Sequence, residues 1–426
     1  MIRLDNWRVR MEVRDRELGY ESDHLHRRLE IAADLDAGWA VKLDMALGKA
    51  KNVVDLERTG DVLWVELTRD ILAADGLYGA VSFINQNGCG ESSRNLRRTR
   101  DVLLGLAAHP NVYGVVAIGL GCEINRMDDF LAELKARTSK PVEALLIQEE
   151  GGTIETVAKA KKIARRMIIE ASMCRREECD LSELILGVEC GGSDATSGLV
   201  SNPVMGLVSD RVVAAGGTSM FSETVEMIGA EHILARRAAT PEVGQKILDY
   251  VKHREQEQID AGEDVRKTQP SPGNKDGGIT TLEEKSLGCI YKGGSTPIVD
   301  MIDCAHAPEK KGLVLMDTPC YDMLSVTAKA AGGCQLIVFT TGRGNAIGNP
   351  VVPVMKVTAN GETFRRMNDN IDLDMSGVLT ENVSLDEMAD RTLRQIADTL
   401  SGRLTSAEVL GLGYSETIIS RACEYC

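Results

Sequence analysis

Short runs of aliphatic and β-branched residues alternate along most of the chain with longer segments whose apolar positions recur every three to four residues. The short runs are typical of buried strands and the longer segments of amphipathic helices. The predicted strands are the runs at 115–118, 144–147, 184–188, 212–215, 313–316, 336–339 and 351–357. The predicted helices cover 94–108, 127–136, 155–172, 223–237, 243–256 and 385–400. Repetition of strand, glycine turn and helix predicts an α/β fold with parallel, Rossmann-like layers.

A polar stretch at 256–276, which contains two glycines and two prolines, interrupts this pattern. It predicts a domain boundary or a long functional loop. The first 80 residues carry charges throughout and hold one strand-like run, at 62–65. We therefore expect a divergent N-terminal segment (1–80), a first α/β domain (81–265) and a second (266–426). Because ligands of parallel sheets bind beyond the carboxyl ends of the strands, we expect the site in the cleft between these two domains.

Composition narrows the classes of function. The chain has 426 residues, of which 43% are hydrophobic and 27% charged, as in ordinary globular proteins. A formal net charge of −15 disfavours nucleic acid and anionic membranes as partners. No apolar run reaches the roughly 20 residues that span a bilayer, and the charged start lacks the apolar core of a signal peptide. We therefore expect a cytoplasmic protein, whose 11 cysteines are thiols.

Three thiols follow apolar runs in glycine-rich segments: Cys89, Cys122 and Cys190. Thiols at the ends of neighbouring strands could converge on one metal ion. Glu123, adjacent to one of them, could serve as a further ligand or as a base. The alternative for each cysteine is a small buried side chain beside a turn.

Two further segments suit a polar ligand. Residues 271–286 are rich in neutral hydrogen-bonding groups and include Lys275 and Lys285, which suits a polyhydroxylated or carboxylate ligand. The alternative is a surface loop followed by a helix-capping box. Arg343 lies between two glycines after a predicted strand, where it could clamp a carboxylate. The glycine spacing there departs from the dinucleotide fingerprint, and no phosphate-binding loop motif is present, which argues against a nucleotide ligand.

At these segments the sequence resembles the altronate and galactarate dehydratase family of sugar-acid hydro-lyases. The resemblance runs from about residue 85 to the end and rests on motifs in family order. They are Asn-Gly-Cys-Gly at 87–90, Gly-Leu-Gly-Cys-Glu at 119–123, Glu-Cys-Gly-Gly-Ser-Asp at 189–194, Ser-Asn-Pro at 201–203, Ser-Pro-Gly-Asn-Lys at 271–275, Gly-Gly-Ile-Thr-Thr-Leu-Glu-Glu-Lys-Ser-Leu-Gly-Cys at 277–289 and Thr-Thr-Gly-Arg-Gly at 340–344.

The resemblance implies a metal-dependent lyase that removes water from a sugar acid such as altronate or galactarate. The product would be a 2-keto-3-deoxy acid. The implied cofactor is a divalent metal, Fe²⁺ before Mn²⁺ or Zn²⁺, which would stabilise the ene-diolate formed beside the carboxylate. An iron–sulfur cluster held by the same thiols is the alternative.

Motif and strand-end placement together suggest a role for each candidate residue. The expected metal ligands are Cys89, Cys122 and Cys190, with Glu123 as a fourth ligand or a catalytic group. Lys285 or Asp194 would handle the protons. The expected substrate-binding residues are Ser193, Asn274, Lys275, Thr280, Thr341 and Arg343.

The chain departs from the family pattern at its N-terminal end. We find no stretch that aligns with the family's small β-clip (SAF) module. The family also usually carries an Arg-x-Asp-Gly-x-x-Gly-x-Arg-Asn segment that is followed by another Gly-Cys segment, and we find neither in residues 1–80. This layout resembles the large subunit of sulfolactate sulfo-lyase, which expels sulfite instead of water. The alternatives are therefore a carbon–sulfur lyase subunit of that type, or a subunit that is inactive without a small SAF partner. We also expect a homo-oligomer.

Overall fold

The computed structural model describes residues 80–83, 93–174 and 177–413. The chain divides into two compact units, Met1–Ser82 with Lys162–Arg175 and Phe83–Lys161 with Arg176–Cys426. All the strands of the described residues belong to the second unit. Among the described residues, no helix combines the length and the apolar character that a membrane span requires.

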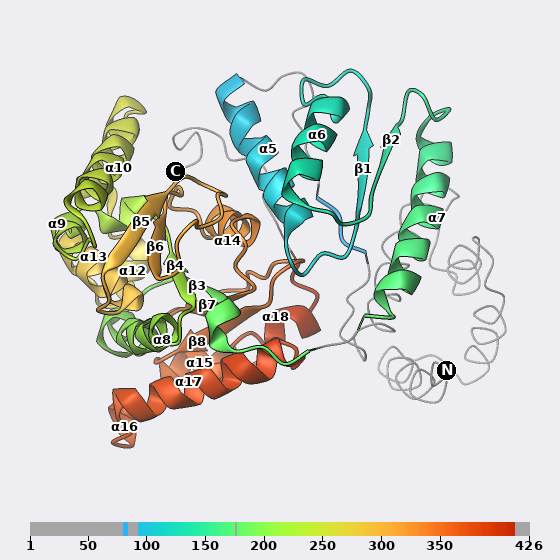
Figure 1. The fold of residues 1–426 in the computed structure, drawn as a ribbon. Coiled ribbons are helices and arrows are strands. Elements are labelled where there is room, and N and C mark those ends of the chain that lie inside the picture. The colour runs from blue at the N-terminus through green and yellow to red at the C-terminus, as the bar shows by residue number, and fades with distance from the viewer. Residues whose placement is uncertain (1–79, 84–92, 175–176, 414–426) are drawn as a thin grey trace, which may run out of the picture. The chain divides into compact units, whose positions relative to one another are not determined.

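A seven-stranded parallel sheet forms the centre of the second unit (Figure 1). This sheet confirms the predicted α/β class with parallel layers. It takes strands from both sides of residue 265, so the expected boundary at 265/266 lies between strands of one sheet. Its spatial order is β5 (Ile298–Ile302), β6 (Leu313–Met316), β4 (Thr218–Phe221), β3 (Ile185–Cys190), β7 (Leu336–Thr340), β8 (Val354–Thr358) and β9 (Leu373–Asp374).

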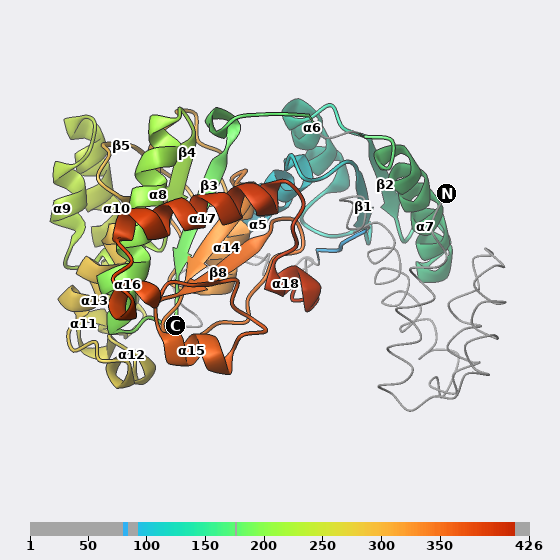
Figure 2. The same ribbon diagram turned by 90° about the horizontal axis from the view of Figure 1, so that it is seen from below.

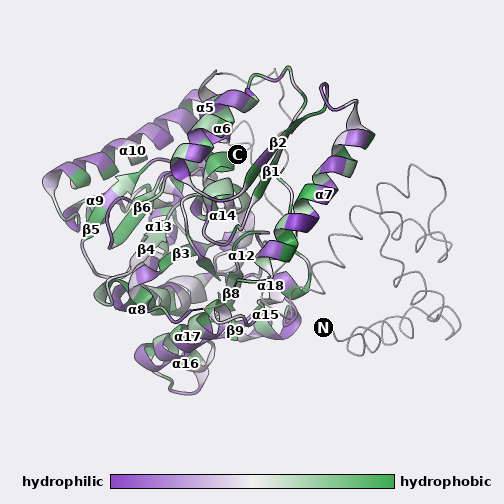
Figure 3. Ribbon diagram, turned by 45° about the vertical axis from the view of Figure 1, so that its right-hand side comes forward, coloured by the Kyte–Doolittle hydropathy of each residue, from purple (hydrophilic) through white to green (hydrophobic). Residues whose placement is uncertain are grey.

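Both faces of this sheet are buried, as successive residues of β7 illustrate. Leu336 and Val338 join one hydrophobic cluster, while Ile337 and Phe339 join another, because side chains alternate across a strand. The labelled strands are accordingly mostly hydrophobic in Figure 3. The first cluster includes residues of α8 (Asn202–Ala214), α10 (Pro241–Asp260) and α17 (Leu385–Leu400), and α8 and α17 pack together (Figure 2). The second includes residues of α5 (Ser93–Ala108) and α14 (Asp322–Ala331).

A small parallel sheet of two strands precedes the large one in sequence. It pairs β1 (Val115–Gly119) with β2 (Val142–Leu146), and α6 (Met127–Arg137) connects the two strands. The longer α7 (Thr153–Ala171) follows β2. Each of these elements was predicted from the hydrophobic pattern.

Shorter helices carry much of the site. A π-helix, η2 (Ser197–Ser201), precedes α8, and the 3-10 helices are η1 (Leu181–Glu183), η3 (Thr224–Met227) and η4 (Tyr291–Gly293). The other short α-helices are α9 (Glu231–Arg236), α11 (Val265–Thr268), α12 (Pro272–Asp276), α13 (Leu282–Ile290), α15 (Gly361–Arg366), α16 (Gly377–Thr380) and α18 (Ser406–Val409).

Two predicted elements differ from the structure. The run at 212–215 is not a strand, because Val204, Val208 and Val212 recur at helical spacing and pack α8 into the core. The strand that follows it, β4, is short and half polar. The helix predicted at 223–237 is interrupted at Gly229, whose φ of 95° lies in the left-handed region, so only η3 and α9 form there.

Candidate active site

The loops that follow β3, β4, β6 and β7 meet at one edge of the sheet, as expected for neighbouring parallel strands. β3 ends at Cys190, β4 leads into η3, and β6 leads through Cys320 into α14. A pocket of ≈ 280 Å³ lies at this edge. It is lined by Gly191, Gly192, Ser193, Glu226, Gln269, Ser271, Gly273, Asn274, Lys285, Cys320, Asp322 and Arg343.

Helix α13 and the η4 turn bring three functional side chains to this edge. Lys285, Cys289 and Lys292 are spaced by four and three residues, which places them on one helical face. Asn202, at the start of α8, links α13 to β7. Its amide nitrogen donates to the Gly288 carbonyl of α13 (2.9 Å), and its amide oxygen accepts from Thr340 Oγ1 of β7 (2.7 Å).

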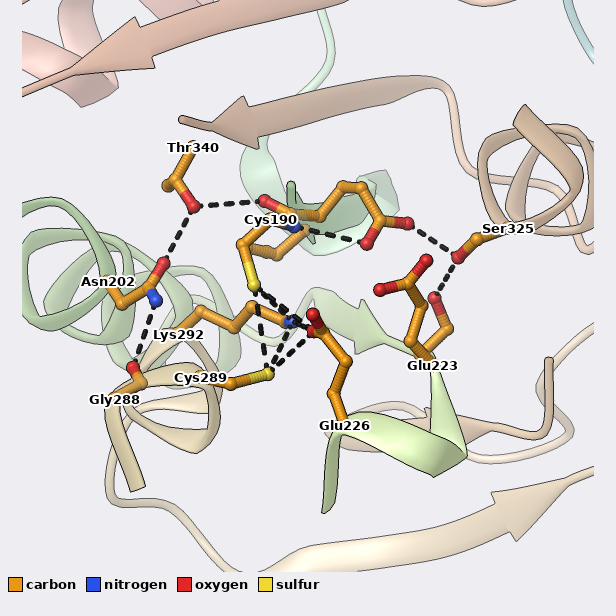
Figure 4. A network of polar contacts seen from close by, with 12 residues as sticks. Cys190, Asn202, Glu223, Glu226, Gly288, Cys289, Lys292, Ser325 and Thr340 are labelled. Atoms are coloured by element: carbon orange, nitrogen blue, oxygen red, sulfur yellow. Dashed lines mark hydrogen bonds and ion pairs between the residues drawn. The ribbon is translucent and has the colours of Figure 1, made fainter. Parts of the chain in front are cut away.

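Cys190, Cys289 and Glu226 form a buried group of metal-ligating type (Figure 4), and Glu226 also lines the pocket. The two sulfur atoms lie 3.7 Å apart. Glu226 Oε2 lies 2.9 Å from the Cys289 sulfur and 3.3 Å from the Cys190 sulfur. The Lys292 ammonium contacts all three, at 2.9 Å from Cys190 Sγ, 3.0 Å from Cys289 Sγ and 3.2 Å from Glu226 Oε2.

Lys292 and Glu226 stabilise each other's charge, whereas the hydrogen bond with Cys289 and burial raise the pKa of the Cys190 thiol well above its usual value. Burial opposes the charged form of Lys292, but the negative potential of Cys190, Cys289 and Glu226 outweighs it and raises the pKa of this lysine well above its usual value. Burial likewise opposes ionisation of Glu226, yet Lys292 and then Lys285 lower the pKa of its carboxyl to about 2. Glu226 is therefore a carboxylate at neutral pH.

A second group shares Glu226 and adds Glu223 and Cys320, with one ligand atom of each within 4.8 Å of the others. The residue Glu223 has a φ of 67°, and its backbone N–H donates to Thr318 Oγ1 (2.9 Å). Both carboxylate oxygens of Glu223 are buried and have no hydrogen-bond partner among the described residues. Burial, followed by the charge of Glu189, raises the pKa of Glu223 well above its usual value.

A buried polar network lies beside Glu223. Lys329 and Glu189, both with side chains 0% exposed, form an ion pair. Ser325 Oγ donates to Glu189 Oε2 (2.5 Å) and lies 2.7 Å from Ser222 Oγ, to which Lys329 also donates. The negative charge of Glu189 is thus fixed next to the unpaired carboxyl of Glu223.

The pocket itself presents both signs of charge. Lys285 Nζ donates to Gln269 Oε1 (3.1 Å) and lies 3.8 Å from Glu226 Oε1. Although burial opposes its charge, the surrounding Cys320, Glu226 and Glu223 raise the pKa of Lys285. Burial and then Glu189 raise the pKa of Asp322 to about 7. The exposed Arg343 adds a second cation to the wall.

Four of the residues predicted from sequence line this pocket: Ser193, Asn274, Lys285 and Arg343. The amide of Asn274 is occupied, because Nδ2 donates to the Ser193 carbonyl (2.9 Å) and Oδ1 accepts from Ser271 Oγ (2.8 Å). Asn274 therefore shapes the wall of the pocket.

Four other predicted residues are not among the lining residues, and three of them form hydrogen bonds with other parts of the chain. Asp194 Oδ1 accepts from Thr196 Oγ1 (2.7 Å), and its Oδ2 accepts from Asn360 Nδ2 (2.8 Å). Thr280 Oγ1 donates to Glu284, and Thr341 Oγ1 accepts from the Gly344 N–H. The side chain of Lys275 is exposed.

The structure does not bring two of the predicted metal-binding thiols, Cys122 and Cys190, together. Cys190 belongs to the buried group with Cys289 and Glu226. Cys122 is exposed beyond β1, where Gln148 Nε2 donates to its sulfur (3.5 Å), and the Glu123 carboxylate accepts from the Leu120 and Gly121 N–H groups. Neither described metal-ligating group includes them, and Cys89 lies outside the described residues.

Sequence reasoning missed most of the acidic and cationic side chains of the site. Glu223 and Glu226 stand directly after a strand that was not predicted, and Cys320 and Asp322 follow β6 through a short polar link. The usable signal was the helical spacing of Lys285, Cys289 and Lys292, which lie within and just beyond the motif at residues 277–289.

Comparisons with known proteins confirm the resemblance and extend it to residue 50, within the segment that was expected to be divergent. The model of the family described as D-galactarate/altronate dehydratase, C-terminal, matches residues 181–424. The model described as D-galactarate dehydratase/altronate hydrolase, second domain, matches residues 50–172.

Characterised relatives cover most of the chain. It is 40% identical over 354 residues to the (2R)-sulfolactate sulfo-lyase subunit beta of Chromohalobacter salexigens, covering 82% of this chain and 89% of that protein. It is 38% identical to the altronate dehydratase of Bacillus subtilis (76% of this chain, 64% of that protein). It is 36% identical to the galactarate dehydratase (L-threo-forming) of Escherichia coli, covering 70% of this chain and 58% of that protein. The family models and these relatives together show that the chain belongs to the D-galactarate/altronate dehydratase family.

Proposed function

We propose that this chain catalyses a metal-assisted β-elimination of water from a sugar acid such as altronate or galactarate, giving a 2-keto-3-deoxy acid. The observation that carries the proposal is the pocket at the carboxyl ends of the strands, which Lys285 and Arg343 line together with Glu226 and Asp322. Such a pocket suits a small hydroxy acid, because cations bind its carboxylate and acids exchange its protons. The dehydratase relatives support the same reaction class.

The unpartnered carboxylate of Glu223 supports a cation beside this pocket. A buried carboxylate without hydrogen bonds is costly unless it is protonated or coordinates a metal. Glu223, Glu226 and Cys320 would hold the ion, since two carboxylates and one thiol suit Fe²⁺ or Mn²⁺. When bound, such a metal supplies Lewis-acid stabilisation of the charge that develops on the substrate's carboxylate. The set Cys89, Cys122 and Cys190, holding one ion or an iron–sulfur cluster, is the competing arrangement.

Three residues that line the pocket would bind the substrate and transfer its protons. Arg343 offers a planar pair of donors to the substrate's carboxylate. Asp322 is placed to accept the proton next to that carboxylate. Asp322, with a pKa of about 7, can pass that proton to the departing hydroxyl group, and Lys285, whose raised pKa keeps it charged, would stabilise the departing group as a cation. The enol that remains then becomes the keto acid.

A carbon–sulfur lyase is the second candidate, favoured by how much of each relative the chain covers. The chain spans 89% of the sulfolactate sulfo-lyase subunit but 58% to 66% of the three dehydratases. A chain of this layout would work with a small partner of the SAF type. The elimination would be the same, with sulfite as the leaving group.

Turnover assays separate these candidates. The chain, prepared without oxygen and loaded with Fe²⁺ or Mn²⁺, is incubated with altronate, galactarate or sulfolactate, with and without a small SAF protein. Formation of 2-keto-3-deoxy acid supports the dehydratase, and release of sulfite supports the carbon–sulfur lyase. Absence of both products under every condition would contradict the proposal.

A further inference from the structure

The buried group of Cys190, Cys289 and Glu226 has the spacing of a site for a thiophilic metal. Two sulfur atoms at ~2.3 Å from one tetrahedral ion lie about 3.8 Å apart. The two sulfur atoms here are 3.7 Å apart, with a carboxylate oxygen 2.9 Å and 3.3 Å from them. In the structure, however, this space already contains a positive charge.

That charge is the ammonium of Lys292, which lies within hydrogen-bonding distance of all three ligand atoms. Its three N–H donors match the two sulfurs and the carboxylate oxygen, at 2.9, 3.0 and 3.2 Å. The lysine side chain is 0% exposed. In Figure 4 the side chain of Lys292 extends between Cys190 and Cys289 towards Glu226.

The backbone around Lys292 is anchored to α8. The Lys292 carbonyl accepts from Ser209 Oγ of α8 (2.9 Å). Helix α8 and η4 pack so closely at Gly206 that a Cβ there would lie 2.3 Å from the Tyr291 carbonyl oxygen. The backbone from which the Lys292 side chain extends is therefore fixed against α8.

We propose that Lys292 is a built-in cation that closes the Cys190/Cys289/Glu226 group to metal ions and so determines which metal the site accepts. Thiolate pairs select Zn²⁺ and similar soft ions, whereas carboxylate-rich groups suit Fe²⁺ and Mn²⁺. With the thiol pair occupied by Lys292, the group of Glu223, Glu226 and Cys320 is left for a harder ion. This inference rests on the proposed function only for the role of that second group.

Cadmium binding tests the inference without any turnover. Metal-free, reduced protein is titrated with Cd²⁺, and the sulfur-to-cadmium absorption in the near ultraviolet is recorded. We expect the absorption of the wild-type protein to be unchanged by Cys190→Ser. We expect Lys292→Met to bind one additional Cd²⁺ per chain with a stronger band. That gain should disappear in the matched variant Lys292→Met/Cys190→Ser, which corrects for cadmium on the exposed thiols.

Two outcomes would overturn the inference. One is a wild-type cadmium band that falls in Cys190→Ser, because the thiol pair would then bind metal despite Lys292. The other is a folded Lys292→Met protein without any gain that depends on Cys190. If Lys292→Met does not fold, the wild-type comparison decides alone. Loss of the proposed function would appear as absent sugar-acid turnover and would leave these spectra unchanged.

Discussion

The ammonium nitrogen of Lys292 lies 2.9 Å from the sulfur of Cys190, although 102 positions separate the two residues in the chain. Cys190 is the last residue of the central strand β3, and Lys292 belongs to the turn that continues α13. Their contact joins the end of β3 and the turn after α13 into one buried group. The pocket above them contains the charges needed for chemistry on a hydroxy acid.

The unpartnered Glu223 gives the first prediction. In Glu223→Gln the affinity for Fe²⁺ or Mn²⁺ should fall by more than the roughly 10- to 100-fold that loss of a hydrogen-bond partner of a metal ligand costs. The metal-free variant should keep the stability of the metal-free wild type, because burial and Glu189 already disfavour a charge on Glu223 and the substitution removes no hydrogen bond. Metal titration and urea denaturation measure the two effects.

Cys122→Ser is the matched control for this variant. Its thiol is exposed and lies outside both described metal-ligating groups, so metal affinity should not change. The opposite pattern, with metal lost from Cys122→Ser and kept by Glu223→Gln, would favour the thiol set predicted from sequence.

The buried pair of Lys329 and Glu189 gives the second prediction. Lys329→Met leaves a carboxylate without its counter-charge where both side chains are 0% exposed, and should lower the unfolding free energy by about 3–5 kcal/mol. The double variant Lys329→Met/Glu189→Gln should recover much of that loss, because the uncompensated charge is gone. Urea denaturation of the wild type and of the single and double variants gives a double-mutant cycle of unfolding free energies. If the effects of the two substitutions on the unfolding free energy simply add, the prediction is contradicted.

Arg254 supports the site from a distance, which gives the third prediction. Its guanidinium makes two bonds to Asp317 (2.8 and 2.7 Å), and Asp317 Oδ1 accepts from Thr224 Oγ1 (2.7 Å) at the start of η3. Because η3 carries Glu226 and follows Glu223, Arg254→Lys should weaken metal binding and lower kcat. It should leave KM for the acid nearly unchanged, since Arg254 does not line the pocket.

The exposed Arg266 provides the comparison for Arg254→Lys. It pairs with Glu255 (2.6 Å) while its side chain is 48% exposed, so Arg266→Lys should alter stability by less than about 0.5 kcal/mol. Equal effects of the two substitutions on metal affinity would show that Arg254 has no positioning role.

The parts of the site that were predictable follow strands with an unmistakable hydrophobic pattern. Cys190 ends such a strand, Arg343 follows another, and Lys285 lies in a distinctive motif. The acids of η3 were missed because the run at 212–215 was interpreted as the strand. The true strand, β4, was then overlooked, and the turn after it was interpreted as the start of a helix.

The partners of buried charges could not be inferred from spacing. Lys292 and Lys329 stand in ordinary helical surroundings in the sequence, and their acidic and thiol partners come from other strands and turns. Only the parallel pairing of β3 with β4 and β7 brings these groups together. Local pattern predicts the elements, whereas the register of the sheet determines which charges meet.

His109 gives the last prediction, which concerns stability and pH. It is 1% exposed, with Nε2 2.9 Å from the Cys334 carbonyl oxygen, while Nδ1 accepts from the Asn111 N–H (3.0 Å). These bonds require the neutral ring with its proton on Nε2, and burial lowers the pKa of His109 to about 4. The unfolded chain, in which histidine titrates near ~6.5, therefore binds a proton at higher pH than the folded one.

The sign of the effect follows from this difference. Above pH ~6.5 neither state is protonated and His109 costs nothing, but as pH falls from there to about 4 the unfolded state is increasingly favoured, by up to about 3 kcal/mol. In His109→Gln this part of the acid destabilisation should disappear, whatever the variant's stability at pH 8. Urea denaturation at several pH values between 8 and 4 measures it, and parallel profiles for wild type and variant would contradict the neutral, buried state of His109.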